Sequence, residues 1–166
     1  MKNRGMYLES IVNKTILLYK QNDIGIFHKK ELPISFRKVI NRKGKNKIED
    51  AYIKTKSTTD YYGCWNGKFV AFEAKSTNTD VLPLSNLKDH QQNYLKSIIK
   101  NNGIGFYIVC FKKYNRFFIV LPSIFEGMDR KSLTMERVIE KGIEMDLIYP
   151  GVIDFVPALN GIKKNR

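Results

Sequence analysis

The most constraining feature of this chain is a short alternating segment, KFVAFEAK, at residues 68–75. Side chains two apart on a strand share a face, so Val70, Phe72 and Ala74 are expected to point one way. The opposite face is expected to carry the other side chains: Phe69, Ala71, Glu73 and Lys75. Because Ala71 is small, we expect this second face to be open rather than packed. Its carboxylate and ammonium form either an exposed ion pair or part of a reactive site.

Hydrophobic periodicity predicts helices around that strand. A helix is expected over residues 6–20, and a second over 86–102 that ends before Gly103. Strands are expected at 25–34, 51–56, 68–75, 104–111 and 116–122, a loop at 76–86, and short helices at 123–128 and 132–142. The dipeptide Asn66-Gly67 predicts a hairpin turn between the strands at 51–56 and 68–75. This order predicts an α/β fold in which helices sandwich a sheet.

Length and composition fit one globular domain over residues 1–166, with 43% hydrophobic residues. The longest apolar run, at 104–111, is too short to span a bilayer, and no apolar stretch follows the basic N-terminus as in a signal peptide. Cys64 and Cys110 form no CxxC pair, which favours a reduced, cytosolic chain without a disulfide.

Positive charge dominates the composition, because 29 Lys and Arg oppose 16 acidic residues to give +13. Such an excess favours a polyanionic partner: DNA, RNA or an anionic membrane, although no basic amphipathic helix supports a membrane. The segment at 35–48 contains no acid and is either a solvated loop or a phosphate-contacting projection with Gly44 at its tip. Its length and purity favour a projection, and the predicted DNA-binding residues are Arg37, Lys38, Arg42, Lys43, Lys45 and Lys47, with Lys54 and Lys56 after it.

Two polar residues border the apolar stripes of the predicted helices. Gln91 falls within the stripe of the second helix, where an unsatisfied buried amide would cost roughly 1–3 kcal/mol. It is either a core glutamine bonded to the backbone or a neighbour of the carboxylates, since its helix follows the strand at 68–75. Glu9 borders the stripe of the first helix, where a solvated helix-edge glutamate is the alternative to a site residue.

Oxygen donors are the ligands that this chain can assemble: Thr58, Asp60, Glu73 and Gln91. Carboxylates with waters and a substrate phosphate suit Mg²⁺, for which Mn²⁺ can substitute. His28 and His90 are too few and too separated for a zinc triad. No nucleophile motif supports a Ser-His-Asp or Cys-His mechanism.

The pattern Asp60…Glu73-Ala74-Lys75 resembles that of the PD-(D/E)xK nuclease superfamily, with Thr59 where proline often stands. The blocks NRGMYLESIVNKT, AYIKTKSTTDYYG and LPLSNLKDHQ resemble the RecU-type Holliday junction resolvases more narrowly. This resemblance runs from about Asn3 to Phe125. It implies a restriction-endonuclease-like fold with a central mixed β-sheet flanked by helices and a basic stalk, at about 35–50, that projects between the early strands. Residues 161–166, GIKKNR, are expected to be a basic C-terminal tail.

The resemblance also implies roles for particular residues. Thr58, Asp60, Glu73 and Gln91 would hold a divalent metal, here Mg²⁺. Lys75 would stabilise the transition state, and Glu9 would be a supporting member of the site. The products would carry a 5′-phosphate and a 3′-hydroxyl. The chain departs from the family where KKELPI replaces a Pro-Thr-Pro stretch and where Ser76 replaces a common acid.

The implied function is a Mg²⁺-dependent endonuclease that resolves four-way DNA junctions by paired cuts during recombination and repair. A C2 homodimer with one site per subunit matches the symmetry of a junction. A RecA-type recombinase and a branch-migration helicase are the expected protein partners, and the nucleoid in the cytoplasm is the expected location. Two alternatives stay open: a nuclease of the same fold that acts on other DNA, and a non-catalytic DNA-binding protein that modulates recombination.

Overall fold

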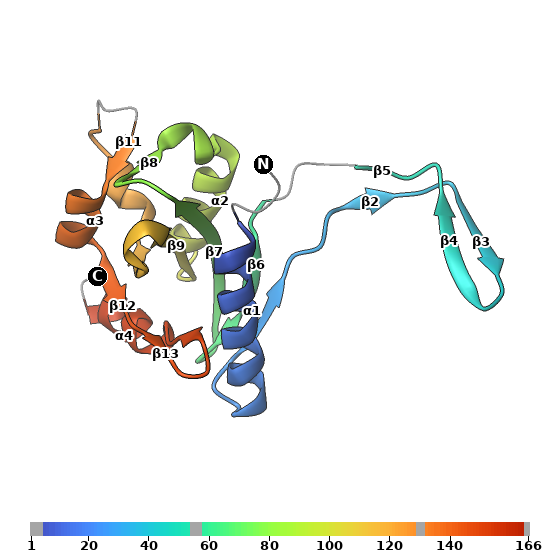
Figure 1. Cartoon of the computed structure of the whole chain (residues 1–166), viewed down its shortest axis with the longest axis horizontal. Helices are drawn as coiled ribbons and strands as arrows, with labels where there is room; N and C mark the ends of the chain where they lie inside the picture. The colour runs from blue at the N-terminus through green and yellow to red at the C-terminus, as the bar shows by residue number, and fades with distance from the viewer. Residues whose placement is uncertain (1–4, 54–57, 129–131, 165–166) are drawn as a thin grey trace.

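A six-stranded mixed sheet forms the centre of the computed structural model, which describes residues 5–53, 58–128 and 132–164 (Figure 1). Its strands, in spatial order, are β1 (Ile26–Lys29), β6 (Tyr61–Trp65), β7 (Lys68–Thr77), β9 (Ile104–Phe111), β10 (Arg116–Val120) and β12 (Ile143–Met145). Strands β7 and β9 run parallel, and the other neighbouring pairs are antiparallel. The predicted α/β class with a central mixed sheet is confirmed.

Helices cover both faces of this sheet: α1 (Met6–Gln21), α2 (Asp89–Lys100), α3 (Met135–Lys141) and α4 (Val156–Lys164). The face beneath α1 and α4 carries a stack of rings, in which Phe72 lies 4.9 Å from both Tyr61 and Phe106 between ring centroids. The face beneath α2 and α3 buries Leu95 and Val138 in a second apolar cluster. The sheet is therefore the middle of three layers and is buried on both sides.

The hairpin at Asn66-Gly67 joins β6 to β7, not the segment at 51–56 to β7 as the sequence predicted. Both turn residues have positive φ, 50° and 70°, as a two-residue type I′ turn requires. Strand β6 escapes prediction because Gly63 interrupts its run of β-forming residues. That glycine is needed, since a Cβ there would collide with the carbonyl oxygen of Ile26 on β1.

Between β1 and β6 the chain leaves the sheet and projects as an arm, residues 34–53 (Figure 1). The arm contains two paired ribbons, β2 (Ile34–Ser35) with β5 (Tyr52–Ile53) and β3 (Lys38–Arg42) with β4 (Lys45–Glu49). Its tip is a second two-residue turn, at Lys43-Gly44, with φ values of 51° and 74°. The predicted projection between the early strands is confirmed, and it is built as a β-ribbon.

The remaining elements are short: β8 (Val81–Pro83), β11 (Ser132–Thr134), β13 (Leu147–Ile148), β14 (Val152–Ile153), and the 3₁₀ turns η1 (Leu84–Asn86), η2 (Lys112–Tyr114) and η3 (Pro122–Phe125). Strand β8 lies inside the predicted loop and pairs with β11. The prediction of a basic C-terminal tail is wrong for residues 161–164, because α4 includes them and buries Ile162 against the sheet. Within the described ranges, no helix has both the length and the apolar character to cross a bilayer.

Candidate functional site

Glu73 lies in the middle of β7 on the face covered by α2. Its side chain is 0% exposed, and that of Lys75 is 15% exposed. The expectation of an open face is therefore wrong, because α2 packs over this part of the strand. A fully buried carboxylate is rarely retained without a partner, and it is not half of an idle surface ion pair.

The Lys75 ammonium joins strand β7 to helix α2. Its Nζ donates to Glu73 Oε2 at 2.8 Å and to Gln91 Oε1 at 3.2 Å. Gln91 is buried, and its amide oxygen accepts from this ammonium. The contact therefore places Gln91 beside the carboxylate, as one of the two sequence interpretations expected.

Asp60 reaches the same place from the start of β6. Its backbone carbonyl accepts from the Lys30 N–H at 2.7 Å, and its Oδ2 accepts from the Ala74 N–H at 3.2 Å. The pKa of Glu73 is raised to about 8, mainly by burial and then by the negative charge of Asp60, while Lys75 opposes the shift. Two carboxylates thus share one poorly solvated position beside an ammonium.

An unsatisfied oxygen marks this position. Glu73 Oε1 is buried and has no hydrogen-bond partner among the described residues. Leaving such an oxygen unpaired is costly, and a divalent cation would satisfy it and offset the repulsion from Asp60. Two carboxylates and the Gln91 amide oxygen are hard donors of the kind that Mg²⁺ prefers. The residues present therefore fit a hard divalent cation.

This donor set is small. The described part of the chain holds no group of three or more His, Cys, Asp or Glu side chains placed to bind a metal. A cation here would rely on two carboxylates, an amide, waters and substrate oxygens, a mixture that is usual for Mg²⁺. A zinc site, which takes nitrogen and sulfur ligands, does not fit.

Thr58 stands at the edge of the site and contacts a residue that sequence reasoning missed. Its Oγ1 accepts a hydrogen bond from Lys30 Nζ at 2.6 Å. Lys30 follows β1, and its backbone N–H donates to the Asp60 carbonyl, so a second lysine is anchored at the edge of the site. The β1–β6 pairing was the signal that could have found Lys30, but β6 itself was not predicted. The role of Thr58 as a metal ligand stays a prediction.

Tyr107 is a second residue that the sequence did not single out. It lies directly opposite Glu73 in the parallel β7–β9 register, and its hydroxyl is buried without a hydrogen-bond partner in the described residues. Burial raises its pKa above the usual value, and the nearby Glu73 charge adds to this. The parallel register that brings the two together could not be read from either strand alone.

Glu9 pairs with a lysine outside the predicted site. Its Oε2 accepts from Lys29 Nζ at 2.6 Å in a half-exposed ion pair, and no hydrogen bond among the described residues joins it to Asp60 or Glu73. The start of α1 is nevertheless close to the site, because Gly5 lines the same cavity as Lys75. The supporting role of Glu9 stays a prediction.

Comparison with known proteins identifies the family. The sequence matches the family RecU, described as "Recombination protein U", over residues 3–161. The chain belongs to the RecU family.

Curated relatives cover almost the whole of this RecU-family chain. The "Holliday junction resolvase RecU" of Mycoplasmopsis pulmonis is 36% identical over 164 residues, which are 99% of this chain and 98% of the relative. The "Holliday junction resolvase RecU" of Ureaplasma parvum is 36% identical, and the match covers 98% of this chain and 95% of the relative. That of Listeria welshimeri is 40% identical over 144 residues, 81% of this chain and 72% of the relative.

A solved structure supports the fold. The chain is similar to Archaeoglobus fulgidus Hjc, a Holliday junction resolvase from an archaeal hyperthermophile, with a TM-score of 0.50 and 9% sequence identity. The match covers 81% of this chain and 94% of that chain. At this identity the likeness concerns the fold, which is the restriction-endonuclease-like arrangement expected from the sequence.

The arm of this RecU-family chain carries the predicted DNA-binding residues. Those on its described part are exposed: Arg37, Lys38, Lys43, Lys45 and Lys47. The side chain of Arg42, and Lys54 and Lys56 as a whole, lie outside the described residues. The register of the β3–β4 hairpin puts Lys38 and Lys47 on one face and Val39 and Ile48 on the other. The first face also carries Lys45, Ile40 and Glu49 and is mainly basic, and the second also carries Asn41 and Asn46.

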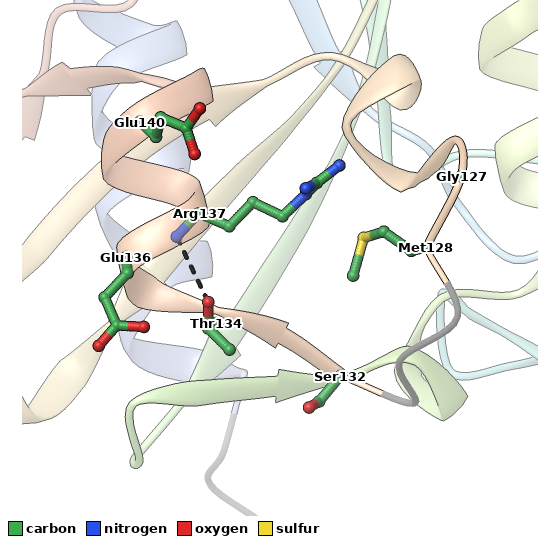
Figure 2. Close-up of a pocket in the computed structure, with 7 residues that line it drawn as sticks. All are labelled: Gly127, Met128, Ser132, Thr134, Glu136, Arg137 and Glu140. Atoms are coloured by element: carbon green, nitrogen blue, oxygen red, sulfur yellow. Dashed lines mark hydrogen bonds between the residues drawn. The ribbon is translucent and has the colours of Figure 1, made fainter.

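A separate cavity of about 440 Å³ lies between α3 and the segment after η3 (Figure 2). Arg137 crosses it, with its backbone N–H bonded to the Thr134 hydroxyl at 3.3 Å and its guanidinium bonded to the Ile124 carbonyl. Its lining includes two glutamates, Glu136 and Glu140, and no predicted site residue among those described. The candidate site is therefore the cluster around Glu73, not this cavity.

Proposed function

We propose that this chain is a Mg²⁺-dependent endodeoxyribonuclease that resolves four-way DNA junctions, with Mn²⁺ able to substitute. The observation that carries the proposal is the buried Glu73 carboxylate, which has one orphan oxygen, Asp60 beside it and the Lys75 ammonium bonded to it. The curated relatives are Holliday junction resolvases, and such enzymes are endonucleases. Both the site and the family support the same class of reaction.

Three donors would hold the cation: Asp60, Glu73 and Gln91. Thr58 would join them if Lys30 released its hydroxyl. When bound, the cation supplies charge neutralisation at the phosphate and lowers the pKa of water. The burial of Glu73 keeps competing bulk water away from this ligand.

Lys75 would act on the substrate directly. Its Nζ already lies within hydrogen-bond distance of two of the proposed ligands, so its charge is fixed beside the reacting phosphate. There it orients the attacking water and offsets the negative charge that develops on the phosphate oxygens. The water oxygen would bond to phosphorus and give up a proton to solvent as the bond to the 3′ oxygen breaks. The 3′ oxygen would take up a proton from solvent, which leaves a 5′-phosphate and a 3′-hydroxyl.

A homodimer would give the paired cuts. On the arm, Val39 and Ile48 are 47% and 48% exposed and face each other on one side of the hairpin. Ile34 and Ile53 form a second exposed apolar pair on the β2–β5 ribbon. Exposed apolar pairs of this kind support burial against a second copy. A two-fold dimer would place one site on each of two symmetric strands.

The basic face of the arm would contact phosphates at the centre of the junction. Lysines that neutralise phosphates contribute affinity without reading sequence, which suits recognition by shape. A recombinase of the RecA type produces such junctions and a branch-migration helicase moves them, so both are natural partners. This function would place the protein in the cytoplasm beside the nucleoid.

The test compares a mobile four-way junction with linear duplex of the same length, each with Mg²⁺, Mn²⁺ or EDTA. The expected result is paired, symmetric, metal-dependent nicks in the junction, with 5′-phosphates at the cut ends. Equal cutting of the duplex would instead indicate a nuclease for other DNA. Junction binding without metal-dependent product would indicate a non-catalytic modulator, and either result overturns the proposal.

A further inference from the structure

Two adjoining cavities lie beside the candidate site, at the carboxyl end of β7. The first, about 370 Å³, is lined by Lys75, Ser76, Asn86 and Lys88 among others. The second, about 200 Å³, is lined again by Ser76 and Asn86 and reaches Lys112 on η2. Because they share two lining residues, the cavities border each other, and we call the pair, from Lys75 to Lys112, the trough.

The chemistry of the trough is that of a phosphate-binding surface. Its described lining residues include Lys75, Lys88 and Lys112, several hydroxyls and two asparagine amides, and they include no Asp or Glu. The cavity at α3 in Figure 2 differs, because two glutamates line it. Ammonium, hydroxyl and amide groups are the side chains that contact DNA phosphates and sugars.

We infer that this trough holds the sugar-phosphate backbone of the cut strand on one side of the scissile phosphate. The inference rests on the proposed function, which puts the scissile phosphate at Lys75. Lys88 and Lys112 then neutralise neighbouring phosphates, and Ser76 and Asn86 bond the backbone between them. Contacts of this kind set the register of the strand in the site and carry no base preference.

The walls of the trough are ordered by their own hydrogen bonds. The Thr77 hydroxyl donates to the Val81 carbonyl at 2.8 Å, and the Thr79 N–H donates to Thr77 Oγ1 at 3.2 Å. Lys113 Nζ lies 3.6 Å from Asp80 Oδ1 and ties this loop to η2, which carries Lys112. A trough shaped before DNA arrives loses little conformational entropy on binding.

Two glutamine variants, Lys88→Gln and Lys112→Gln, test the trough, and Lys100→Gln is their control. Lys100 is exposed at the opposite end of the helix that follows Lys88. Junction binding is measured in EDTA over a range of salt concentrations. Each trough variant should weaken binding several-fold and reduce the slope of log K against log salt by about 0.9, the contribution of one neutralised phosphate. Lys100→Gln should leave both unchanged, and Lys112→Arg should restore the slope.

A substitution in the DNA gives a test that does not depend on folding of a variant. Single methylphosphonates, which remove the charge of one phosphate, are placed on each side of the cleavage position. Methylphosphonates on one side of the cleavage position should weaken junction binding by the wild type. The same methylphosphonates should weaken binding by Lys112→Gln little further, because that variant already lacks the lysine that contacts the phosphate. Equal effects on the wild type and Lys112→Gln at every position would overturn the trough.

The outcomes separate this inference from the proposed function. If the wild type cuts junctions but both trough variants keep its salt slope, the assignment of the trough to DNA binding is wrong and the proposed nuclease function is unaffected. If the wild type cuts no DNA with any metal, yet the slope falls in both variants, the nuclease is wrong and the trough stands as a DNA-binding site.

Discussion

The body of the molecule and its arm are built from the same local structure but held together differently. Each contains a hairpin closed by a two-residue turn with positive φ, at Asn66-Gly67 in the body and at Lys43-Gly44 in the arm. In the body, Phe72 is 0% exposed between helices, whereas Phe36 at the base of the arm hairpin is 50% exposed. A turn therefore makes a hairpin, but only the side chains that it brings together decide whether a core forms.

The arm hairpin has few stabilising contacts of its own. Val39 pairs with Ile48 across the strands, and the Asn41 amide donates to Asn46 Oδ1 at 3.0 Å. Cross-strand pairs contribute roughly 0.2–1 kcal/mol each, and a two-stranded hairpin alone is marginal in water. We therefore expect DNA and a second copy of the chain to stabilise the arm further.

Charged side chains are buried in the body and exposed on the arm. The body buries Glu73 and Lys75 together, where each depends on the other. The arm exposes Lys38, Lys43 and Lys45, where charge costs little and is available to phosphate. Chemistry and affinity should therefore be separable by substitution.

The largest expected effect is on catalysis in the body. Asp60→Ala removes a carboxylate from the proposed metal site and should reduce junction cleavage by about a thousandfold or more. Junction affinity should stay within about twofold, because the basic residues of the arm are untouched. Single-turnover cleavage and binding in EDTA measure the two, with the exposed Asp146→Ala as the matched control. Cleavage that survived Asp60→Ala would remove this site from the mechanism.

The next effect concerns stability and uses one isoleucine from each region. Ile108 is fully buried in β9, and Ile108→Ala should lower the free energy of unfolding by about 2–5 kcal/mol. Ile40 lies on the basic face of the arm hairpin, and Ile40→Ala should cost less than about 1 kcal/mol. Urea unfolding measures both. Equal losses would mean that the arm shares the cooperative core of the body.

More of the candidate site than of the strands around it could be predicted from the sequence. Asp60, Glu73, Lys75 and Gln91 stood out by residue type, by periodicity and by resemblance to a nuclease family. The hydrogen bonds of Lys75 with Glu73 and Gln91 bring three of them together, with Asp60 bonded to the same strand. A strand period puts Glu73 and Lys75 on one face and a helix period puts Gln91 in an apolar stripe. The resemblance to a nuclease family was needed to join these residues with Asp60 in one site.

What could not be predicted depends on distant pairing. Strand β6 was missed because its glycine serves the close approach of β1, which no local pattern reveals. Lys30 and Tyr107 come beside the carboxylates through the registers β1–β6 and β7–β9. The burial of Glu73 was missed because it depends on where α2 packs. Strand β5 lies within the predicted strand at 51–56, but β3 and β4 were missed because exposure on both faces leaves no alternation in hydrophobicity.

A third, smaller effect tests the arm as a separate binding element. Replacing residues 38–49 with a short Gly-Ser linker should weaken junction binding by about a hundredfold and reduce the salt slope by about 0.9 for each phosphate that the arm neutralises. The midpoint of thermal unfolding of the body should barely change. A matched variant keeps the hairpin but neutralises it, with Lys38, Lys43, Lys45 and Lys47 changed to Gln. If both variants bound like the wild type, the basic face of the arm would not contact DNA.

The smallest effect is a pH dependence that only the body should show. The pKa of Glu73 in the folded chain is about 8, above its ordinary value of 4.5, so folding favours the protonated carboxyl. Its contribution to stability is therefore fully present below pH 4.5 and is lost as the pH rises through 8. Glu73→Gln cannot lose this proton. Without metal, its stability advantage over the wild type should grow by on the order of 2 kcal/mol between pH 5 and pH 8.

The same pair of proteins reports on the cation by a readout other than cleavage. Mg²⁺ that binds only the folded wild type should raise its free energy of unfolding at pH 8 by mass action, while Glu73→Gln should gain little. The difference in free energy of unfolding between Glu73→Gln and the wild type at pH 8 should therefore shrink or change sign when EDTA is replaced by Mg²⁺. Glu49 is a half-exposed carboxylate on the arm that lies 3.9 Å from Lys47, and Glu49→Gln should differ from the wild type by less than about 0.5 kcal/mol under every condition. A wild type whose stability ignored Mg²⁺ at pH 8 would mean that Glu73 is buried for a reason other than holding a cation.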